Sequence, residues 1–401
     1  MPAKASPPMK IVVSPLSGIG HGVQAPRGKT CRHSPGGRMS RSATCPPTPG
    51  VARAFVLATS SAAVLAAAIL APHASVEAQS QGSAAQVLGQ RFGLTRDQLA
   101  SVDAGTAIAV VLPSSADGEI VVAGGVFVHA TAARLVAVLQ DVERLESGGG
   151  FIRTKRLSEP PRLSDFAGFQ LPPADVEALR DCRPGRCEVK LGQSGFDRLA
   201  KVDWVSPDAA ARVSALARQA ALDYVLAYRK GGDRELAVYL DSDRPQAIAS
   251  EFAQMIHRVD LWPDVLTPLA KYFGGYPTAA RSRLTSNFFY WSLAEFGLKP
   301  VFRINHVVVD KTGRTSGPLY IVAVKQLYAS HYFRTAFEVR AVLSDRHPSG
   351  KGVYLVVLNM ARSDGLTGLF GGLIKSRARD GSRDGLERAL AAIRRMAEAG
   401  R

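Results

Sequence analysis

Residues 287–362 contain five apolar segments in succession: NFFYWSLAEFG (287–297), VFRINHVVVD (301–310), LYIVAVKQLY (319–328), HYFRTAFEVRAVL (331–343) and VYLVVLNMAR (353–362). The segments are rich in β-branched and aromatic residues, are bounded by Gly, Pro, Asp and Ser, and are too short for typical helices, which is the pattern of β-strands. Because the connections are too short to contain crossover helices, we predict an antiparallel sheet.

The fourth segment alternates between apolar and polar side chains. Its odd-numbered positions from 333 to 341 are mostly apolar, whereas Arg334, Glu338 and Arg340 point to the other face. This period of two predicts a sheet with one buried and one solvated face. The first segment differs, because residues 288–291 are all aromatic and point to both faces. We expect that strand to be covered on both sides.

The first 78 residues are predicted to lie outside the folded core. Arg53 precedes the run AFVLATSSAAVLAAAILA (54–71), and VEA, ending at Ala78, follows it. A basic residue, an apolar run and small residues at a cleavage site are typical of a secretory signal peptide. We therefore expect a periplasmic or secreted protein that is cleaved near Ala78. The alternative is a membrane anchor formed by the same run, which approaches the roughly 20 residues that span a bilayer.

The chain is basic, with a net charge of +16 over 401 residues, and 46% of its residues are hydrophobic, which is ample for a core. Removal of residues 1–78 takes away eight Lys or Arg and one acidic residue and leaves a net charge of +9. Such a charge favours a soluble surface or attraction to an anionic membrane. Nucleic acid is not an expected partner, because the protein is exported and its basic residues are dispersed.

Two cysteines remain in the mature chain, Cys182 and Cys187, on either side of a Pro-Gly turn. In an oxidising compartment this spacing favours a disulfide bond that closes a short loop. A zinc site would need two further ligands nearby, and a redox CxxC motif would need two intervening residues rather than four. No metal site is predicted.

The mature chain is predicted to contain two domains. The first, residues 88–230, has strands at 107–112 and 119–129 and helices at 131–145 and 206–229. A capping box at Thr95 to Gln98 opens a short helix before them. The second domain, residues 232–401, begins with a strand at 235–240 and helices at 245–256 and 261–273. The five strands follow, and then a helical region at 364–399 that is expected to break near its internal glycines.

The predicted fold class is α+β: an antiparallel sheet wrapped on a long C-terminal helix, preceded by a mixed α/β N-terminal domain. The element order over residues 232–401 resembles the START-like helix-grip superfamily, which includes polyketide cyclases and lipid-binding proteins. That resemblance implies a curved sheet that grips the last helix and leaves an apolar cavity for a hydrophobic ligand. The superfamily typically has six strands after the two helices, and five are evident here.

Polar residues that interrupt the apolar strands are the candidate ligand-binding residues: Tyr290, Arg303, His306, Lys325, Tyr328, His331, Tyr332 and Asn359. A single histidine on an apolar face is more often a hydrogen-bonded core group than a functional one. The sequence contains no HExxH, GxSxG, phosphate-loop or dinucleotide motif, so no cofactor is expected.

The leading hypothesis is a non-enzymatic protein that binds a hydrophobic small molecule or lipid under its C-terminal sheet. One alternative is a cyclase- or hydrolase-like enzyme that uses His306 or His331 with Tyr328. Another is an envelope assembly protein whose N-terminal domain binds a protein partner.

Overall fold

The computed structural model describes residues 83–399 except 115, 280–283, 296–298, 315–316, 345–346, 348–349 and 365–370, without side chains at 371–374. The predicted signal segment, 54–71, lies outside the described residues. The part of the chain that is described belongs to one compact unit. Within it, no helix is long and apolar enough to cross a membrane.

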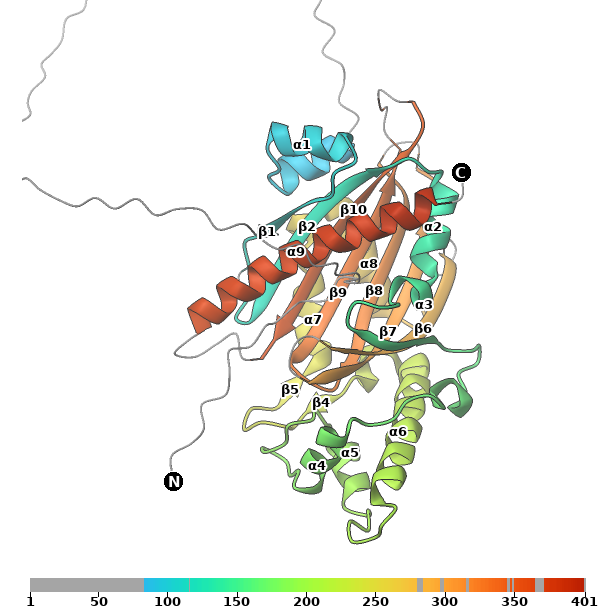
Figure 1. Ribbon diagram of the computed structural model, residues 1–401, viewed down its shortest axis with the longest axis vertical. Coiled ribbons are helices and arrows are strands. Elements are labelled where there is room, and N and C mark those ends of the chain that lie inside the picture. Colours follow the sequence, from blue (N-terminus) through green and yellow to red (C-terminus); the bar gives the residue numbers. More distant parts are fainter. Residues whose placement is uncertain are drawn as a thin grey trace, which may run out of the picture. The chain divides into compact units, whose positions relative to one another are not determined.

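Eight strands form a single antiparallel sheet in the order β1-β2-β10-β9-β8-β7-β6-β3 (Figure 1). The five predicted C-terminal strands are confirmed as β6 to β10, and the α+β fold class is confirmed with them. The strands are β1 (Ile108–Leu112), β2 (Glu119–Val128), β3 (Phe151–Arg156), β6 (Leu284–Glu295), β7 (Pro300–Lys311), β8 (Pro318–Ala329), β9 (Phe333–Leu343) and β10 (Val353–Ser363).

The predicted boundary between residues 230 and 232 does not separate two cores. β2 pairs with β10 along its whole length, from Glu119 opposite Arg362 to Val128 opposite Val353. β3 pairs with β6 at the other end of the sheet. Every residue of β2 is buried, so its backbone groups need a strand on each side. The segments 88–230 and 232–401 therefore share one sheet, which corrects the two-domain prediction.

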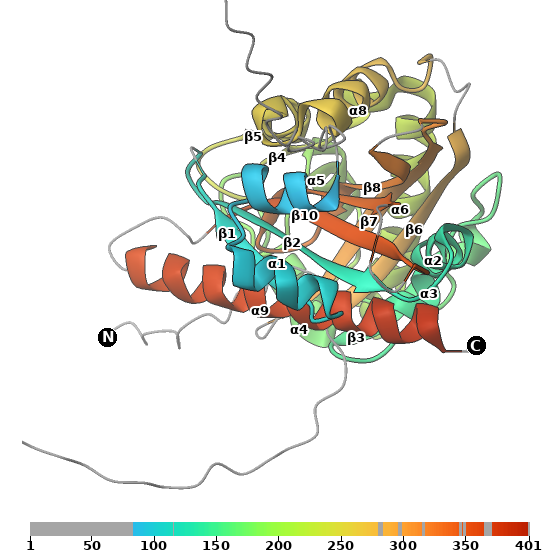
Figure 2. The same cartoon turned by 90° about the horizontal axis from the view of Figure 1, so that it is seen from above.

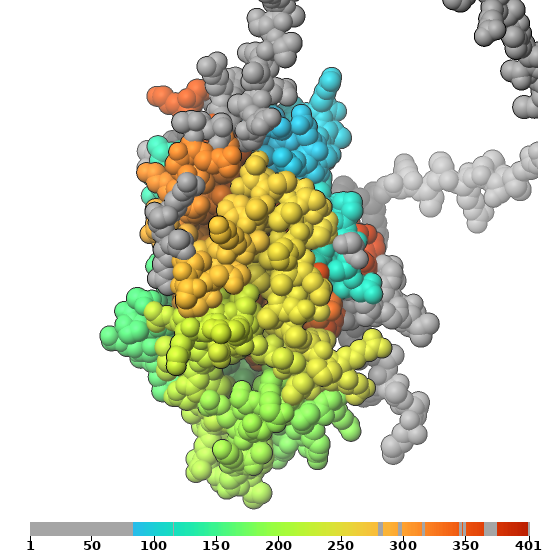
Figure 3. Space-filling view, turned by 180° about the vertical axis from the view of Figure 1, so that it is seen from behind, coloured from blue at the N-terminus to red at the C-terminus, as the bar shows by residue number. Residues whose placement is uncertain are grey.

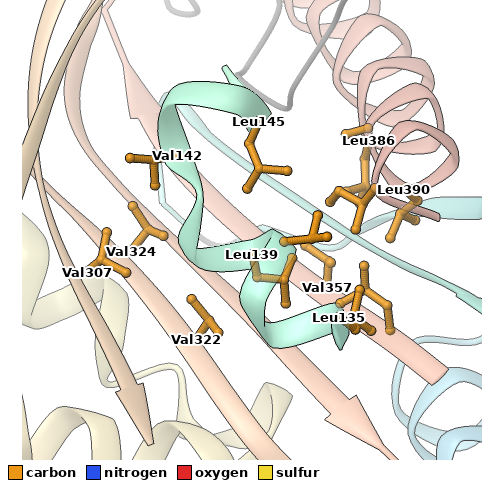
Figure 4. Close-up of a cluster of buried hydrophobic side chains, with 14 of the residues drawn as sticks. Leu135, Leu139, Val142, Leu145, Val307, Val322, Val324, Val357, Leu386 and Leu390 are labelled. Carbon is orange, nitrogen blue, oxygen red and sulfur yellow. The ribbon is translucent and has the colours of Figure 1, made fainter. Parts of the chain in front are cut away.

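One face of the sheet is covered by α2 (Ala132–Gln140), α3 (Val142–Leu145) and the long α9 (Gly371–Glu398) (Figure 2). The helix predicted at 131–145 is interrupted at Asp141, whose side chain accepts a hydrogen bond from Arg144 N and caps α3. The break predicted in the last helix is absent. Leu386 and Leu390 of α9 are buried against the sheet with Leu135 and Leu139 of α2 (Figure 4), and this packing outweighs the cost of about 1 kcal/mol per glycine.

The opposite face is covered by η1 (Gln86–Arg91), α1 (Arg96–Asp103), α7 (Ile248–Ile256) and α8 (Pro263–Gly275); Figure 3 shows this side of the molecule. The capping box at Thr95 is confirmed at the start of α1. With helices on both faces, the prediction of a solvated face is wrong. Arg340, which was expected to face solvent, is buried on the face of the sheet that α2, α3 and α9 cover. The aromatic residues 288–291 are covered on both sides, as predicted.

Residues 157–279 form a long excursion between β3 and β6. It contains η2 (Leu163–Phe166), α4 (Pro173–Arg180), α5 (Gln193–Leu199), α6 (Ala209–Gly231), η3 (Gly232–Glu235), β4 (Val238–Tyr239), β5 (Gln246–Ala247) and η4 (Val259–Leu261), besides α7 and α8. Val225 and Tyr228 of α6 pack against Trp291 and Ile304 of the sheet. The strand predicted at 235–240 is reduced to β4, which pairs with β5 in a separate two-stranded sheet.

Candidate functional site

The eight predicted site residues lie in three separate clusters rather than in one site. Tyr290, Arg303 and Asn359 lie on the α9 side of the sheet, and His306 and Lys325 lie on the opposite side. The remaining three lie at the ends of β8 and β9, beside the excursion: Tyr328, His331 and Tyr332.

The first cluster is a buried network around Glu146, which follows α3. The Tyr290 hydroxyl donates to Glu146 Oε1 at 3.0 Å, and Arg303 Nη2 donates to the same oxygen at 3.3 Å and to Ser292 Oγ at 2.9 Å. Burial and the adjacent Glu146 carboxylate raise the pKa of Tyr290 well above its ordinary value. The tyrosine therefore keeps its proton and acts as a donor.

Further buried polar side chains continue this network across the same face of the sheet; together they are called the polar belt. Asn359 Nδ2 donates to Glu338 Oε2 at 3.4 Å, and Glu338 also pairs with Arg340. Between the two ends of the belt, Asn305 Nδ2 and Gln326 Nε2 are buried without a hydrogen-bond partner among the described residues. Sequence analysis did not single out these two amides, although they also interrupt apolar strands.

The second cluster surrounds His306, which is fully buried. His306 Nε2 lies 2.8 Å from Asn287 Oδ1, an acceptor, so this nitrogen carries the proton. His306 Nδ1 then accepts from the Tyr228 hydroxyl at 3.2 Å. The ring also stacks on Phe289. These contacts make His306 a hydrogen-bonded core residue.

Lys325 lies directly opposite His306 on the neighbouring strand and is also fully buried. Its ammonium group pairs with Asp233 of η3 and lies 3.7 Å from the centre of the Phe252 ring. Burial lowers the pKa of Lys325 to about 8, and the Asp233 carboxylate opposes that shift. The pair connects the end of α6 to the sheet.

The depressed pKa of Lys325 predicts a distinctive dependence of stability on pH. From pH 8 to the ordinary lysine pKa near 10.5, the folded chain releases the Lys325 proton while the unfolded chain retains it. Because the unfolded state binds more protons there, this group's contribution to stability rises with pH, by about 2 to 3 kcal/mol between pH 7 and 10. Below pH 8 both states are protonated and the contribution is constant.

Urea denaturation of the wild type and of Lys325→Met at several pH values measures this contribution. The unfolding free energy of the wild type minus that of Lys325→Met should increase from pH 8 to 10. The contributions of the other titrating groups are the same in both proteins and cancel in this difference. Parallel profiles over this range would show that Lys325 titrates normally.

The third cluster contains His331, whose two ring nitrogens both contact acceptors. Nδ1 lies 2.8 Å from Glu188 O, and Nε2 lies 3.0 Å from Asp175 Oδ1 of α4. Both nitrogens therefore donate, and the Asp175 carboxylate balances the imidazolium charge. Both side chains are buried. The pair joins α4 and the 188–191 segment to the end of the sheet.

Tyr332 and Tyr328 are also engaged with the backbone. The Tyr332 hydroxyl accepts from Lys299 N at 3.0 Å, and Tyr332 has a positive φ of 58°. The Tyr328 hydroxyl donates to Lys190 O at 2.8 Å, and burial raises its pKa. With His331 and Tyr328 each bonded to a backbone carbonyl, the described geometry does not form the acid–base pair that the enzyme hypothesis requires.

The Tyr328 ring lines a pocket of about 420 Å³ between α6 and the sheet. Phe302, Ile304 and Tyr328 form the sheet wall, and α6 forms the opposite one. Further walls come from the 189–199 segment and from β4 with its neighbours. Sequence analysis anticipated only Tyr328. The signal that was missed is the spacing of three alanines in α6, Ala217, Ala220 and Ala221. Their small side chains share one face of the helix and line the pocket.

The predicted disulfide bond between Cys182 and Cys187 is present and braces one wall of this pocket. The loop that it closes donates Gly185 N to Leu240 O at 2.7 Å and Cys187 N to Asp241 O at 3.0 Å. Both cysteines pack with Leu179, Val189 and Val213, which line the pocket. The disulfide therefore lies behind the lining rather than inside it.

Among the residues described, no group of three or more His, Cys, Asp or Glu side chains is arranged to hold a metal ion. Compared with known proteins, the chain matches no family model and no curated protein sequence.

Proposed function

We propose that this protein binds a hydrophobic, lipid-like molecule in the pocket between α6 and strands β7 and β8. The observation that carries the proposal is the pocket itself, about 420 Å³ with mainly apolar walls. Ligand pockets usually span about 300–1,000 Å³ and have apolar walls with a few polar groups. The C-terminal sheet forms one wall, as the sequence hypothesis expected, but the pocket lies on the side of the sheet away from α9.

The chemistry of the walls supports an apolar ligand. The hydroxyls of Tyr224 and Tyr328, which both line the pocket, already donate to Leu327 O and Lys190 O. Removing apolar ligand surface from water is favourable by about 25 cal/mol per Å². Burial of apolar surface is therefore the main source of affinity that this pocket offers.

We propose that the chain is related to the helix-grip superfamily, on the basis of the order of its elements. β2, then α2 and α3, then the six strands β3 and β6 to β10, and finally α9 follow the order expected of it. When the elements are matched in this order, the first strand and the two helices lie at 119–145 rather than at 235–273. The excursion between β3 and β6 is then an insertion after the first of the six strands. The pocket then belongs to the insertion.

We also propose that the mature chain acts in the periplasm or outside the cell. The disulfide bond between Cys182 and Cys187 supports this location, because structural disulfides persist mainly in oxidising compartments. The positive charge of the mature chain supports a role near anionic membranes, which contain molecules of the proposed ligand class.

Native mass spectrometry of the gently purified protein tests both proposals. The expected result is a chain that begins after Ala78 and carries a small apolar molecule. Ala217→Phe, which places a ring in the pocket, should lose that molecule, whereas Ala215→Phe on the exposed side of α6 should retain it. Equal occupancy in the two variants would contradict the site, and a chain that retains residues 54–71 would contradict cleavage.

A further inference from the structure

The connection between α5 and α6, residues 200–208, presents apolar side chains to solvent (Figure 1). Val205 is 93% exposed, the largest value among the exposed large hydrophobic side chains of the described residues. Trp204 beside it is partly exposed, and Pro207 is exposed. Isolated apolar residues on a surface need no explanation, but apolar side chains that are exposed together indicate a contact surface. This connection is called the 200–208 loop.

Hydrogen bonds hold the loop in the conformation that exposes Val205. Asp203 Oδ1 accepts from Val205 N at 3.1 Å, which closes a turn just before the exposed side chain. Leu199 O accepts from Val202 N at 3.1 Å, which ties the loop to the end of α5. The exposed valine is therefore a feature of an ordered turn.

The loop is continuous with the apolar lining of the pocket. It follows Leu199 and precedes Val213, and both of these residues line the pocket. Trp204 packs on a small buried cluster, every member of which also lines the pocket: Leu179, Val189 and Val213. Apolar side chains therefore connect the exposed end of the loop with the pocket wall.

The chemistry of the loop fits a lipid surface. Arg180 Cζ lies 6.0 Å from the centre of the Trp204 ring, and Lys201 is exposed in the same loop. Tryptophan and long basic side chains are typical of the boundary between lipid and water, where the ring lies among the head groups and the cation reaches the phosphates. A protein partner would require a wider surface, since stable protein interfaces use roughly 20–30 residues on each side.

We propose that the 200–208 loop docks on a phospholipid surface, with Val205 and Trp204 among the lipids and with Arg180 and Lys201 at the head groups. This inference goes beyond the proposed function, because the contact needs no molecule in the pocket. Where the proposed function also holds, the docked loop brings the pocket wall next to a source of lipid-like molecules.

Tryptophan fluorescence tests the contact. The chain has three tryptophans, and Trp262 and Trp291 are almost completely buried, so Trp204 is the one that lipid can reach. The probe is vesicles of phosphatidylcholine, brominated in its acyl chains, with a minority of phosphatidylglycerol to attract the basic protein. Because bromine quenches on contact, these vesicles should lower the fluorescence of the purified protein, whereas unbrominated vesicles of the same composition should not. Trp204→Phe should abolish the difference.

A matched pair of variants separates the loop from the rest of the basic surface. Val205→Asp should weaken the binding measured by quenching about tenfold, because burial of a valine side chain contributes at least this factor. The fold should be unaffected, since Val205 is almost fully exposed. Ile152→Asp, at a residue of β3 that is 54% exposed, should bind and quench as the wild type does.

Two results would overturn the inference and leave the proposed ligand site untouched. One is equal fluorescence of the wild type with brominated and unbrominated vesicles, or an unchanged response in Val205→Asp. The other is self-association that Val205→Asp abolishes, without quenching by lipid, which would show that the loop docks on protein instead.

Discussion

Replacing Arg362 by Met is expected to lower the free energy of unfolding by about 3–5 kcal/mol. Arg362 is almost fully buried, and its Nε donates to Glu119 Oε2 at 2.9 Å. Its Nη1 donates to Glu251 Oε2 at 2.9 Å and to Gln254 Oε1 at 3.0 Å. Glu119 is completely buried, and among the described residues its carboxylate would retain only the 3.2 Å contact with Arg258. Removing one member of a buried pair leaves an incompletely compensated charge, which is the origin of this large cost.

Urea denaturation measures the loss, and two further variants define its cause. Arg212→Met removes a surface ion pair with Asp208, in which both side chains are more than half exposed, and should leave the free energy of unfolding nearly unchanged. Adding Glu119→Gln to Arg362→Met should recover part of the loss, because it removes the uncompensated carboxylate. A double variant that is less stable by the full sum of the single effects would contradict this explanation.

Replacing His331 by Leu is expected to cost about 3 kcal/mol or more, because it leaves the Asp175 carboxylate buried without its cationic partner. The change should also weaken ligand binding. Asp175 lies on α4 and Glu188 lies next to Val189, so loss of both His331 contacts releases the segments that carry Leu179 and Val189 to the pocket.

Thermal unfolding and ligand titration of the same samples separate the two effects. His257→Leu is the matched control, since His257 is exposed at the end of α7, and it should leave both measurements nearly unchanged. A His331→Leu protein with wild-type stability would show that the pair with Asp175 is not a charged, buried contact.

The strands of the C-terminal half could be predicted from sequence because their signals are local. Residue type and bounding turns define β6 to β10, and the capping box at Thr95 defines the start of α1. The disulfide between Cys182 and Cys187 was equally local, with five positions separating its ends. Each of these features depends on residues that are close in sequence.

Features that depend on distant residues could not be predicted in the same way. β2 pairs with β10 across more than two hundred residues, and the sequence of neither strand identifies the other. Burial of Arg340 depends on distant elements on its side of the sheet, such as α2, which packs on β9. Its alternation with apolar neighbours in the sequence suggested solvent instead. His306 and Lys325 interrupt apolar strands just as Tyr328 does, but only the folded arrangement places Tyr328 beside a pocket and the other two in a core.

A crystal structure of the gently purified protein tests the central claim most directly. The account predicts continuous electron density for an apolar molecule in the pocket between α6 and β7–β8, in contact with Ala217 and Tyr328. A pocket closed by inward movement of α6, or one that contains only separate water molecules after purification and after soaking with a fatty acid, would contradict it.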